Sequence, residues 1–275
     1  MDEKSKKGRV FRQELKNGLW FIFPIFIVFA FWELISRLEI VNPILLPPPT
    51  AVFEHLWVLL SPKGVGGISF FLERHTLVSF YRIMIGYSIA AVSCTFLGFW
   101  MGVSKRAYGF FNPIITLILP IPGLAWVPIV ILWLGLNDLT IIFIVLLVSI
   151  FPIIYNTAAG VRAISKKQIW AAEMMGATRG QIMWKVLFPG AMPYIIAGQK
   201  LALGSAWRAL VGTEMVVATG WGLGYLIFEA RTFMDTATVY GGIAMIALLG
   251  LIIEKIIFGR IEKMTIERWG LSRTL

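Results

Sequence analysis

Long apolar runs are the feature that most constrains this chain. Six of them approach the roughly 20 residues that an α-helix needs to cross about 30 Å of hydrocarbon. A membrane β-barrel would show short alternating segments instead. Hydrophobic residues make up 58% of the 275 residues and charged residues only 15%. The chain is therefore predicted to be an all-α integral membrane protein. The six candidate spans are residues 18–38, 80–103, 113–135, 139–160, 193–217 and 237–257.

The basic residues predict the orientation of these spans. A basic start before an apolar run is also typical of signal peptides, but residues 18–38 lack a convincing cleavage site, so we expect a retained span. Eighteen of the 25 Lys and Arg residues fall in the tails and loops on one side or at the adjoining span ends, and four on the other side counted in the same way. The positive-inside rule then places both termini in the cytoplasm. The predicted domains are a basic tail over 1–17, a six-span domain over 18–257 and a basic tail over 258–275.

The net charge of +10 is attributed to this topology and not to nucleic-acid binding. The segment over 39–79 is predicted to be external. Its three prolines at 47–49 favour a polyproline conformation, and Thr50 is predicted to cap a short helix that runs to about Leu60. Both histidines lie in this segment without a neighbouring cluster of ligands, so no metal site is expected.

The third span contains four prolines. Each internal proline removes a backbone hydrogen bond, so this helix is predicted to be kinked or broken. Carbonyl groups that are freed in lipid must face protein or water. A helix that lines a transport pathway would satisfy them, and a kink that only helps the helices to pack is the alternative. The candidate pathway residues are Pro120, Pro122, Trp126 and Pro128.

The fifth span carries Lys200, Arg208 and Glu214. An unpaired charge at the middle of the membrane costs about 2.5–3.5 kcal/mol, so these side chains are expected to face the bundle interior or a cavity. The two cations lie eight residues apart, near one face of the helix, and could attract an anion along a pathway. The alternative is structural: Lys200 reaches the inner surface, Arg208 pairs with a neighbouring helix and Glu214 lies near the outer interface.

Residues 163–189 resemble a soluble segment between two spans. The sequences SKKQ at 165–168 and TRGQ at 178–181 are capping boxes, each of which predicts a helix start. Gly176 between them suits the left-handed residue that ends a helix, and Pro189 is predicted to stop the second one. The prediction is two short amphipathic helices, over 166–175 and 179–188, that meet at a tight corner on the cytoplasmic side.

This corner carries a resemblance. The sequence WAAEMMG at 170–176, followed by VLFP at 186–189, resembles the EAA signature of ATP-binding-cassette importer permeases. Trp170 stands where the family usually has an acid, which puts a salt bridge from that position to an ATPase in doubt. The resemblance implies a type I importer permease, in which this corner docks on a separate ATPase. The implied coupling residues are Ala171, Ala172, Glu173, Gly176, Thr178 and Pro189.

Three further stretches resemble the nitrate, sulfonate, taurine and bicarbonate branch, and most of all the taurine permeases: NPILLPPPTAVFEHL, PIPGLAWVPIVILWLGL and GSAWRALVGTEMVVATGWGLGYLI. The resemblance implies a homodimer in the bacterial plasma (inner) membrane, two ATP-binding subunits and an extracytoplasmic substrate-binding protein. The last stretch resembles an external gate loop, although a plain turn explains its glycines as well. The gate glycines are Gly220, Gly222 and Gly224.

The sequence also limits the possible activities. No G-x-x-x-x-G-K-[ST] motif occurs, so ATP and Mg²⁺ are expected in the partner ATPase and no cofactor in this chain. Paired intramembrane acids and a nucleophile–base pair, which a membrane enzyme would need, are not evident. A stand-alone carrier or channel would favour pseudo-symmetric halves, which the sequence lacks. The expected function is import of taurine or an aliphatic sulfonate, with nitrate, bicarbonate or a pyrimidine precursor as alternatives.

Overall fold

The structure of the chain is a computed structural model that describes Trp20, residues 23–61 and residues 71–262. Within these ranges the chain forms helices and connecting turns, without a β-strand. The all-α expectation is confirmed. The described residues divide into two compact units, one with residues up to 61 and 230–241, the other with 71–229 and the residues from 242 onward. The predicted tail over 1–17 and most of the C-terminal tail lie outside the described residues.

The smaller unit contains a helix over residues 23–37, from the predicted first span, and α2 (Pro49–Leu59). Pro48 is the N-cap residue of α2, so the prediction that Thr50 caps this helix is wrong. Thr50 lies in the first turn, where its backbone N–H and its hydroxyl donate to the Glu33 carboxylate at 3.1 and 2.9 Å. A carboxylate from the preceding helix thus accepts a hydrogen bond from one of the free backbone N–H groups at the α2 N-terminus.

A second polar contact joins α2 to residues 230–241 within the same unit. Nε2 of His55 lies 2.7 Å from the Thr238 hydroxyl, which donates to the Asp235 carboxylate at 2.6 Å. His55 is therefore a bridging residue between two segments that are far apart in the sequence.

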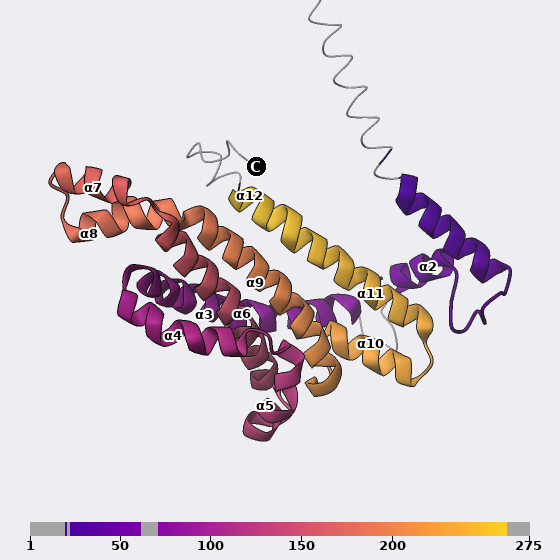
Figure 1. Ribbon diagram of the computed structural model, residues 1–275. Helices are drawn as coiled ribbons and strands as arrows, with labels where there is room; N and C mark the ends of the chain where they lie inside the picture. Colours follow the sequence, from indigo (N-terminus) through magenta and orange to yellow (C-terminus); the bar gives the residue numbers. More distant parts are fainter. Residues whose placement is uncertain (1–19, 21–22, 62–70, 263–275) are drawn as a thin grey trace, which may run out of the picture. The chain divides into compact units, whose positions relative to one another are not determined.

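The larger unit is built around α6 (Asp138–Ala163), which packs along α3 (Phe71–Val103) and α9 (Phe188–Val217) (Figure 1). Small residues allow α6 to approach its neighbouring helices closely. A Cβ atom added to Gly98 of α3 would lie 2.8 Å from a backbone oxygen of α6. The remaining elements are α4 (Lys105–Ile118), η1 (Gly123–Trp126), α5 (Val127–Leu134), α7 (Lys166–Met174), α8 (Arg179–Ile182), η2 (Met183–Leu187), α10 (Leu223–Thr232), α11 (Thr236–Leu251), η3 (Ile252–Phe258) and α12 (Gly259–Glu262).

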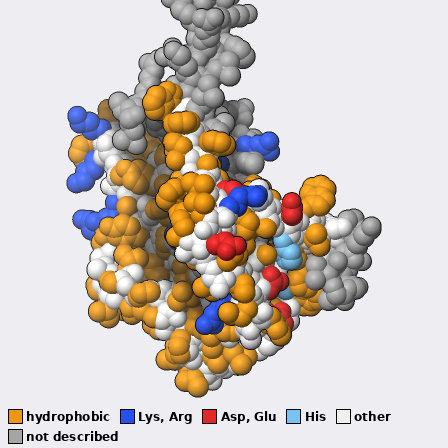
Figure 2. Space-filling view, turned by 90° about the vertical axis from the view of Figure 1, so that its right-hand side faces the viewer, with side chains coloured by type: hydrophobic (Ala, Val, Ile, Leu, Met, Phe, Trp, Pro, Cys, Tyr) orange, Lys and Arg blue, Asp and Glu red, His pale blue; other side chains and the backbone are white. Residues whose placement is uncertain are grey.

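Four helical stretches among the described residues are long and apolar enough to cross a membrane, namely Phe71–Val103, Asp138–Ala163, Arg179–Val217 and Thr236–Lys255. Exposed hydrophobic side chains such as Leu117 and Leu132 lie on the outside of this unit. Figure 2 shows hydrophobic side chains over much of one face. Such a surface suits contact with lipid, because hydrocarbon chains do not penalise exposed apolar groups.

Helix α3 begins nine residues before the predicted boundary of the second span. Residues 71–79, at the end of the segment predicted to be external, are the first turns of α3. These turns contain polar residues, which looked like a loop in the sequence. His75 and Ser79 are nevertheless buried, since both hydrogen-bond the segment at residues 222–223.

The proline-rich third span is broken, as predicted. Lys105–Ile118 and Gly123–Leu134 are bent by 89° about the residues between them. The break lies at Pro120–Pro122, and Pro113 is accommodated inside α4. Helix α4 also starts eight residues before the predicted span, where the Ser104 side chain accepts a hydrogen bond from the backbone N–H of Ala107.

The prediction that Pro189 ends a separate short helix is wrong. Helix α8 continues through the π-helix η2 into α9, so that Arg179–Val217 is one helical stretch. A proline in an α-helix removes the hydrogen bond to the carbonyl four residues earlier and crowds it. The wider π-turn at Met183–Leu187 absorbs this conflict just before Pro189. The amphipathic segment is therefore continuous with the fifth span.

Candidate functional site

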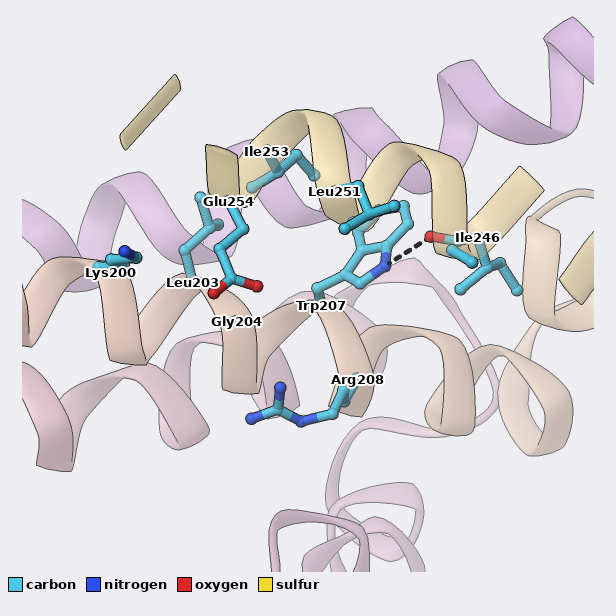
Figure 3. A pocket seen from close by; sticks show the side chains of 11 residues that line it. Lys200, Leu203, Gly204, Trp207, Arg208, Ile246, Leu251, Ile253 and Glu254 are labelled. Atoms are coloured by element: carbon cyan, nitrogen blue, oxygen red, sulfur yellow. Dashed lines mark hydrogen bonds between the residues drawn. The ribbon is translucent and has the colours of Figure 1, made fainter. Parts of the chain in front are cut away.

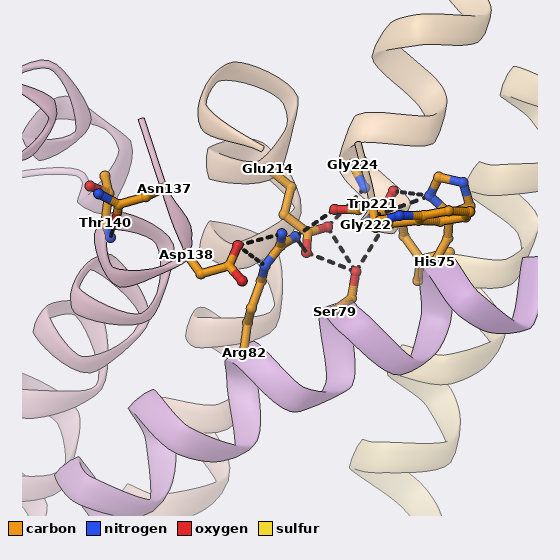
Figure 4. Close-up of polar contacts among 11 residues, drawn as sticks. His75, Ser79, Arg82, Asn137, Asp138, Thr140, Glu214, Trp221, Gly222 and Gly224 are labelled. Atoms are coloured by element: carbon orange, nitrogen blue, oxygen red, sulfur yellow. Dashed lines mark hydrogen bonds and ion pairs between the residues drawn. The ribbon is translucent and has the colours of Figure 1, made fainter. Parts of the chain in front are cut away.

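Arg82 is the centre of a buried polar cluster in the larger unit (Figure 4). Its side chain is only 2% exposed, and its guanidinium donates to Glu214 at 2.8 Å and to Asp138 at 2.7 Å. It also donates to the carbonyl of Trp221 at 2.8 Å. One cation therefore joins α3, the N-terminus of α6, α9 and the loop after α9. We call these residues, together with Ser79 and His75, the Arg82 cluster.

Glu214 is completely buried and well satisfied. Its carboxylate accepts hydrogen bonds from the Ser79 hydroxyl at 2.8 Å and from the backbone N–H of Gly224 at 3.0 Å, in addition to the Arg82 contact. A buried carboxylate is tolerated when it has a cation and several donors around it. Glu214 was predicted as a pathway residue, and the structure places it in this cluster, apart from Lys200 and Arg208.

Of the glycines predicted as an external gate loop, Gly220 and Gly222 lie in the turn between α9 and α10, and Gly224 lies in the first turn of α10. Gly220 and Gly222 have φ values of +96° and +139°, which side chains other than glycine rarely adopt. The backbone N–H of Gly222 donates to Nδ1 of His75 at 3.1 Å. A Cβ atom on Gly222 would lie 2.7 Å from both the Arg82 guanidinium and the Glu214 carboxylate. The turn is therefore held directly against the Arg82 cluster.

Lys200 and Arg208, the two predicted pathway cations, line one pocket of about 450 Å³ (Figure 3). It is formed by α9, α11 and η3, and its other lining residues are mostly apolar. Trp207 donates from Nε1 to the carbonyl of Ile246 at 3.3 Å and so fixes one wall. Arg208 is exposed and turns to Ser205, to which it donates at 3.3 Å. Glu254 from η3 completes the charged lining.

A second pocket, of about 180 Å³, lies beside the break in the third span. Trp126 and Ser205 both line it, so it adjoins the flank of α9 to which Arg208 is bonded. Pro120, Pro122 and Pro128 are exposed in the chain. The structure therefore places Trp126 in a pocket with Ser205, the residue to which Arg208 donates, and does not place the three prolines in either pocket lining.

Five of the six predicted coupling residues lie on α7 or in the corner between α7 and α8, and Pro189 lies in the first turn of α9. Ala172 and Ile182 are buried, which anchors the two helices to each other and to the bundle. The exposed surface mixes apolar and charged side chains: Trp170, Met174 and Met175 are 57%, 89% and 81% exposed, and Lys166, Lys167, Glu173 and Arg179 are exposed beside them. Figure 1 shows α7 and α8 at the end of the larger unit where α6 ends and α9 begins. The placement of the six coupling residues is Ala171, Glu173, Gly176 and Thr178 exposed, Pro189 half-buried and Ala172 buried.

Local capping signals fix this corner. Thr178 and Gln181 form a complete capping box, and Gly176 has φ +78°, both as predicted. The first box is incomplete. The Ser165 hydroxyl accepts a hydrogen bond from the backbone N–H of Gln168 and donates one to Oε1 of Gln168 at 3.3 Å. The Gln168 side chain therefore bonds the Ser165 hydroxyl, and the bond from the Ser165 backbone N–H that would complete the box is missing.

Replacing Thr178 with Ala removes the capping hydrogen bond of α8. We expect a loss of about 1 kcal/mol of local stability, because the backbone N–H of Gln181 loses its acceptor, whereas the bond from the residue 178 N–H to the Gln181 side chain is kept. Hydrogen exchange of residues 179–182 should accelerate by about fivefold, while exchange in α3 stays unchanged. Thr178→Ser keeps the hydroxyl and serves as the control. Equal exchange in the two variants would contradict the role of the cap.

Two charged residues of these sites escaped the sequence analysis, Arg82 of the polar cluster and Glu254 of the pocket lining. Both are charged residues inside apolar runs, and this signal was available in the sequence. An ionisable group within a membrane span is a candidate functional residue by default, since it costs about 2.5–3.5 kcal/mol on insertion scales. Their partners are what the sequence does not show.

Comparisons with known proteins agree with this geometry. Residues 94–261 match the family described as "Binding-protein-dependent transport system inner membrane component". The chain is 34% identical to the taurine transport system permease protein of Escherichia coli (strain K12), over 83% of this chain and 82% of that protein. It is 29% identical to a nitrate import permease protein of Synechocystis sp. (strain ATCC 27184 / PCC 6803 / Kazusa), over 88% and 90%.

A bicarbonate transport system permease protein of the same Synechocystis strain is 30% identical, over 84% of each chain. These matches are to permease components of transport systems and not to enzymes. The chain is a permease subunit that belongs to the binding-protein-dependent inner membrane component family, in the ABC importer branch of the taurine, sulfonate, nitrate and bicarbonate permeases.

Proposed function

We propose that the chain is the transmembrane subunit of an importer for a small sulfonate, with taurine as the favoured solute. The observation that carries this proposal is the 34% identity to the taurine permease protein, which extends over 82% of that relative. Nitrate, bicarbonate or a pyrimidine precursor would use the same machinery and are the alternatives. The nitrate and bicarbonate relatives are 29% and 30% identical, which is why the sulfonate is preferred.

The proposed importer has six spans per copy, with both termini in the cytoplasm of a bacterial inner membrane. Two copies of the chain form the pathway, and an extracytoplasmic binding protein delivers the solute. Two separate subunits bind and hydrolyse ATP with Mg²⁺. Their closure on ATP moves the permease between inward-facing and outward-facing states as rigid bodies.

Coupling is assigned to residues 163–189. The exposed apolar side chains of Trp170, Met174 and Met175 support a docking role, because such side chains on a cytoplasmic corner are suited to a groove on another protein. The continuous helix from α8 into α9 supports the transmission of movement into the membrane. In this proposal the contact at Trp170 is apolar where relatives use an acid.

Reconstitution tests the function. The permease, its genomically adjacent ATPase and its binding protein are placed in proteoliposomes, and uptake of labelled taurine is measured with and without internal ATP. Uptake that needs ATP and the binding protein is expected. Uptake that continues after ATP is removed would favour a stand-alone carrier. ATP-dependent uptake of nitrate or bicarbonate, without uptake of taurine, would show that one of these alternatives is the solute.

A substitution at Gly176 tests the coupling corner. A Cβ atom there meets nothing within 4 Å, so the permease has room for a large side chain, which would obstruct a docked ATPase; the positive φ of +78° adds backbone strain that the control must match. We expect Gly176→Trp to lower ATP-dependent uptake at least about threefold and to weaken co-purification of the ATPase. Gly176→Asn is the control, because asparagine tolerates positive φ and remains small. Equal uptake by the Trp variant and the wild type would refute docking at this corner.

A further inference from the structure

The pocket between α9 and α11–η3 combines a cation and a carboxylate on facing helices. Lys200 extends from α9 and Glu254 from η3, and both line the same cavity of about 450 Å³. Figure 3 shows the Glu254 side chain reaching from η3 toward α9, with its carboxylate on the side of Gly204. The Arg208 guanidinium lies on the other flank of α9, bonded to Ser205. Arg208 still lines the pocket, so the lining carries two cations, Lys200 and Arg208, and one carboxylate, Glu254.

These charges are not neutralised by each other. No ion pair joins Lys200 or Glu254 to another residue in the part of the chain that the structure describes. Because Lys200 and Glu254 line the same cavity without pairing, a small solute has room between the two side chains. Ionisable groups inside membrane spans pair with one another or mark a solute pathway, and an unpaired set favours the second explanation.

The walls of the pocket suit a small solute. Gly204 and Gly250 leave its sides open, and a Cβ atom on Gly250 would come within 3.2 Å of Nε1 of Trp207. The volume lies in the range of small-molecule sites, which combine apolar walls with a few polar groups that fix orientation. The floor is η3, a seven-residue π-helix, and π-helical turns occur frequently at functional sites.

We infer that this pocket is a solute site within the permease that selects a zwitterion, with Lys200 facing the anionic group and Glu254 facing the cationic group. The inference rests on the proposed function and narrows it. An aminosulfonate carries both charges, whereas a plain sulfonate, nitrate or bicarbonate offers nothing for Glu254 to bind. The carboxylate would repel these simple anions, so Glu254 adds discrimination that Lys200 alone does not give.

Glu254→Gln in the complete importer tests this assignment. Proteoliposomes that contain the permease, its ATPase and its binding protein are assayed with labelled taurine. Loss of a charged partner should lower taurine uptake about tenfold. Lys200→Gln should lower it by a similar factor, and Glu254→Asp should restore part of the Glu254 function. Lys105→Gln is the control, since Lys105 is an exposed cation at the start of α4, outside the pocket.

Solute binding to the permease–ATPase complex, measured without the binding protein, shows whether the permease itself is selective. Taurine should raise the Tm of the purified permease–ATPase complex, and ethanesulfonate, which lacks the amino group, should raise it less. In Glu254→Gln the two solutes should become equivalent. If Glu254→Gln imports taurine at the wild-type rate, or if taurine and ethanesulfonate already act alike on the wild type, the pocket does not select a zwitterion. If the wild type imports no sulfonate, the proposed function itself fails.

Discussion

Arg82→Met is expected to destabilise the permease by about 3–5 kcal/mol, because it leaves the Glu214 carboxylate buried without its cation. Glu214 is 0% exposed, and the Arg82 contact at 2.8 Å is its only ion pair in the described part of the chain. Ser79 and the Gly224 N–H would remain as donors. They do not neutralise the charge, so the loss should exceed that of an ordinary hydrogen bond.

The measurement is thermal unfolding of the purified complex, with a double variant as the decisive comparison. Arg82→Met combined with Glu214→Gln removes both charges and should recover most of the lost stability, because no unpaired charge stays buried. Arg37→Met is the matched control. It breaks the Arg37–Glu33 pair, but the Arg37 side chain is 65% exposed, so the loss should remain below about 1 kcal/mol.

Two outcomes would contradict the role of the cluster. An unchanged Tm for Arg82→Met would mean that the Glu214 carboxylate reaches solvent or takes up a proton without cost. A double variant that is no more stable than the single one would be the other. The loss would then come from packing around the Arg82 stem and not from the charge.

The membrane helices could be predicted from the sequence because hydropathy alone determines them. The cost of charge in lipid does not depend on which helix lies beside which, so the runs that became α6, α9 and α11 were recognisable. The first turns of α3 were missed for the same reason. His75 and Ser79 are polar, and only the turn at residues 222–223, more than 140 residues away, explains why they are buried.

Local chemistry predicted some parts of the sites and failed at others. Gly176 and the Thr178 capping box depend on neighbours within a few residues, and both were predicted. Pro189 depends on what precedes it: the π-turn at Met183–Leu187 carries the helix through a residue that usually ends one. Thr50 failed because Glu33, from the preceding helix, takes the capping role. Partners across elements are not encoded in any single window of the sequence.

The Arg82–Glu214 pair is the clearest case of this limit. Each residue is visible alone as a charge in an apolar run, and the two are 132 positions apart. To predict that the two residues pair, one must know how α3 and α9 are rotated relative to each other, and this rotation depends on small residues at the helix contacts. The glycines after α9 were visible as a turn, but their contact with the pair was not. One substitution at that contact has a large expected effect.

Gly224→Ala should destabilise the turn that joins α9 to α10. A Cβ atom at residue 224 would lie 2.8 Å from Cβ of Glu214 and closer still to the backbone oxygen of Val211. These atoms belong to α9 or to a side chain held at both oxygens, so they cannot move aside independently. Overpacking of this kind typically costs about 1–3 kcal/mol. The shift would also lengthen the hydrogen bond from the Gly224 N–H to Glu214.

Gly109→Ala provides the comparison, since the same methyl group is added at a helical glycine with open space around it. An alanine inside α4 should stabilise by about 0.5–1 kcal/mol, because glycine loses more backbone freedom on folding. The two variants should therefore move the Tm of the purified complex in opposite directions. Uptake should fall only for Gly224→Ala, because only that change disturbs the turn held by the Arg82 cluster. A common direction of the Tm change would show that close contact with α9 does not constrain this position.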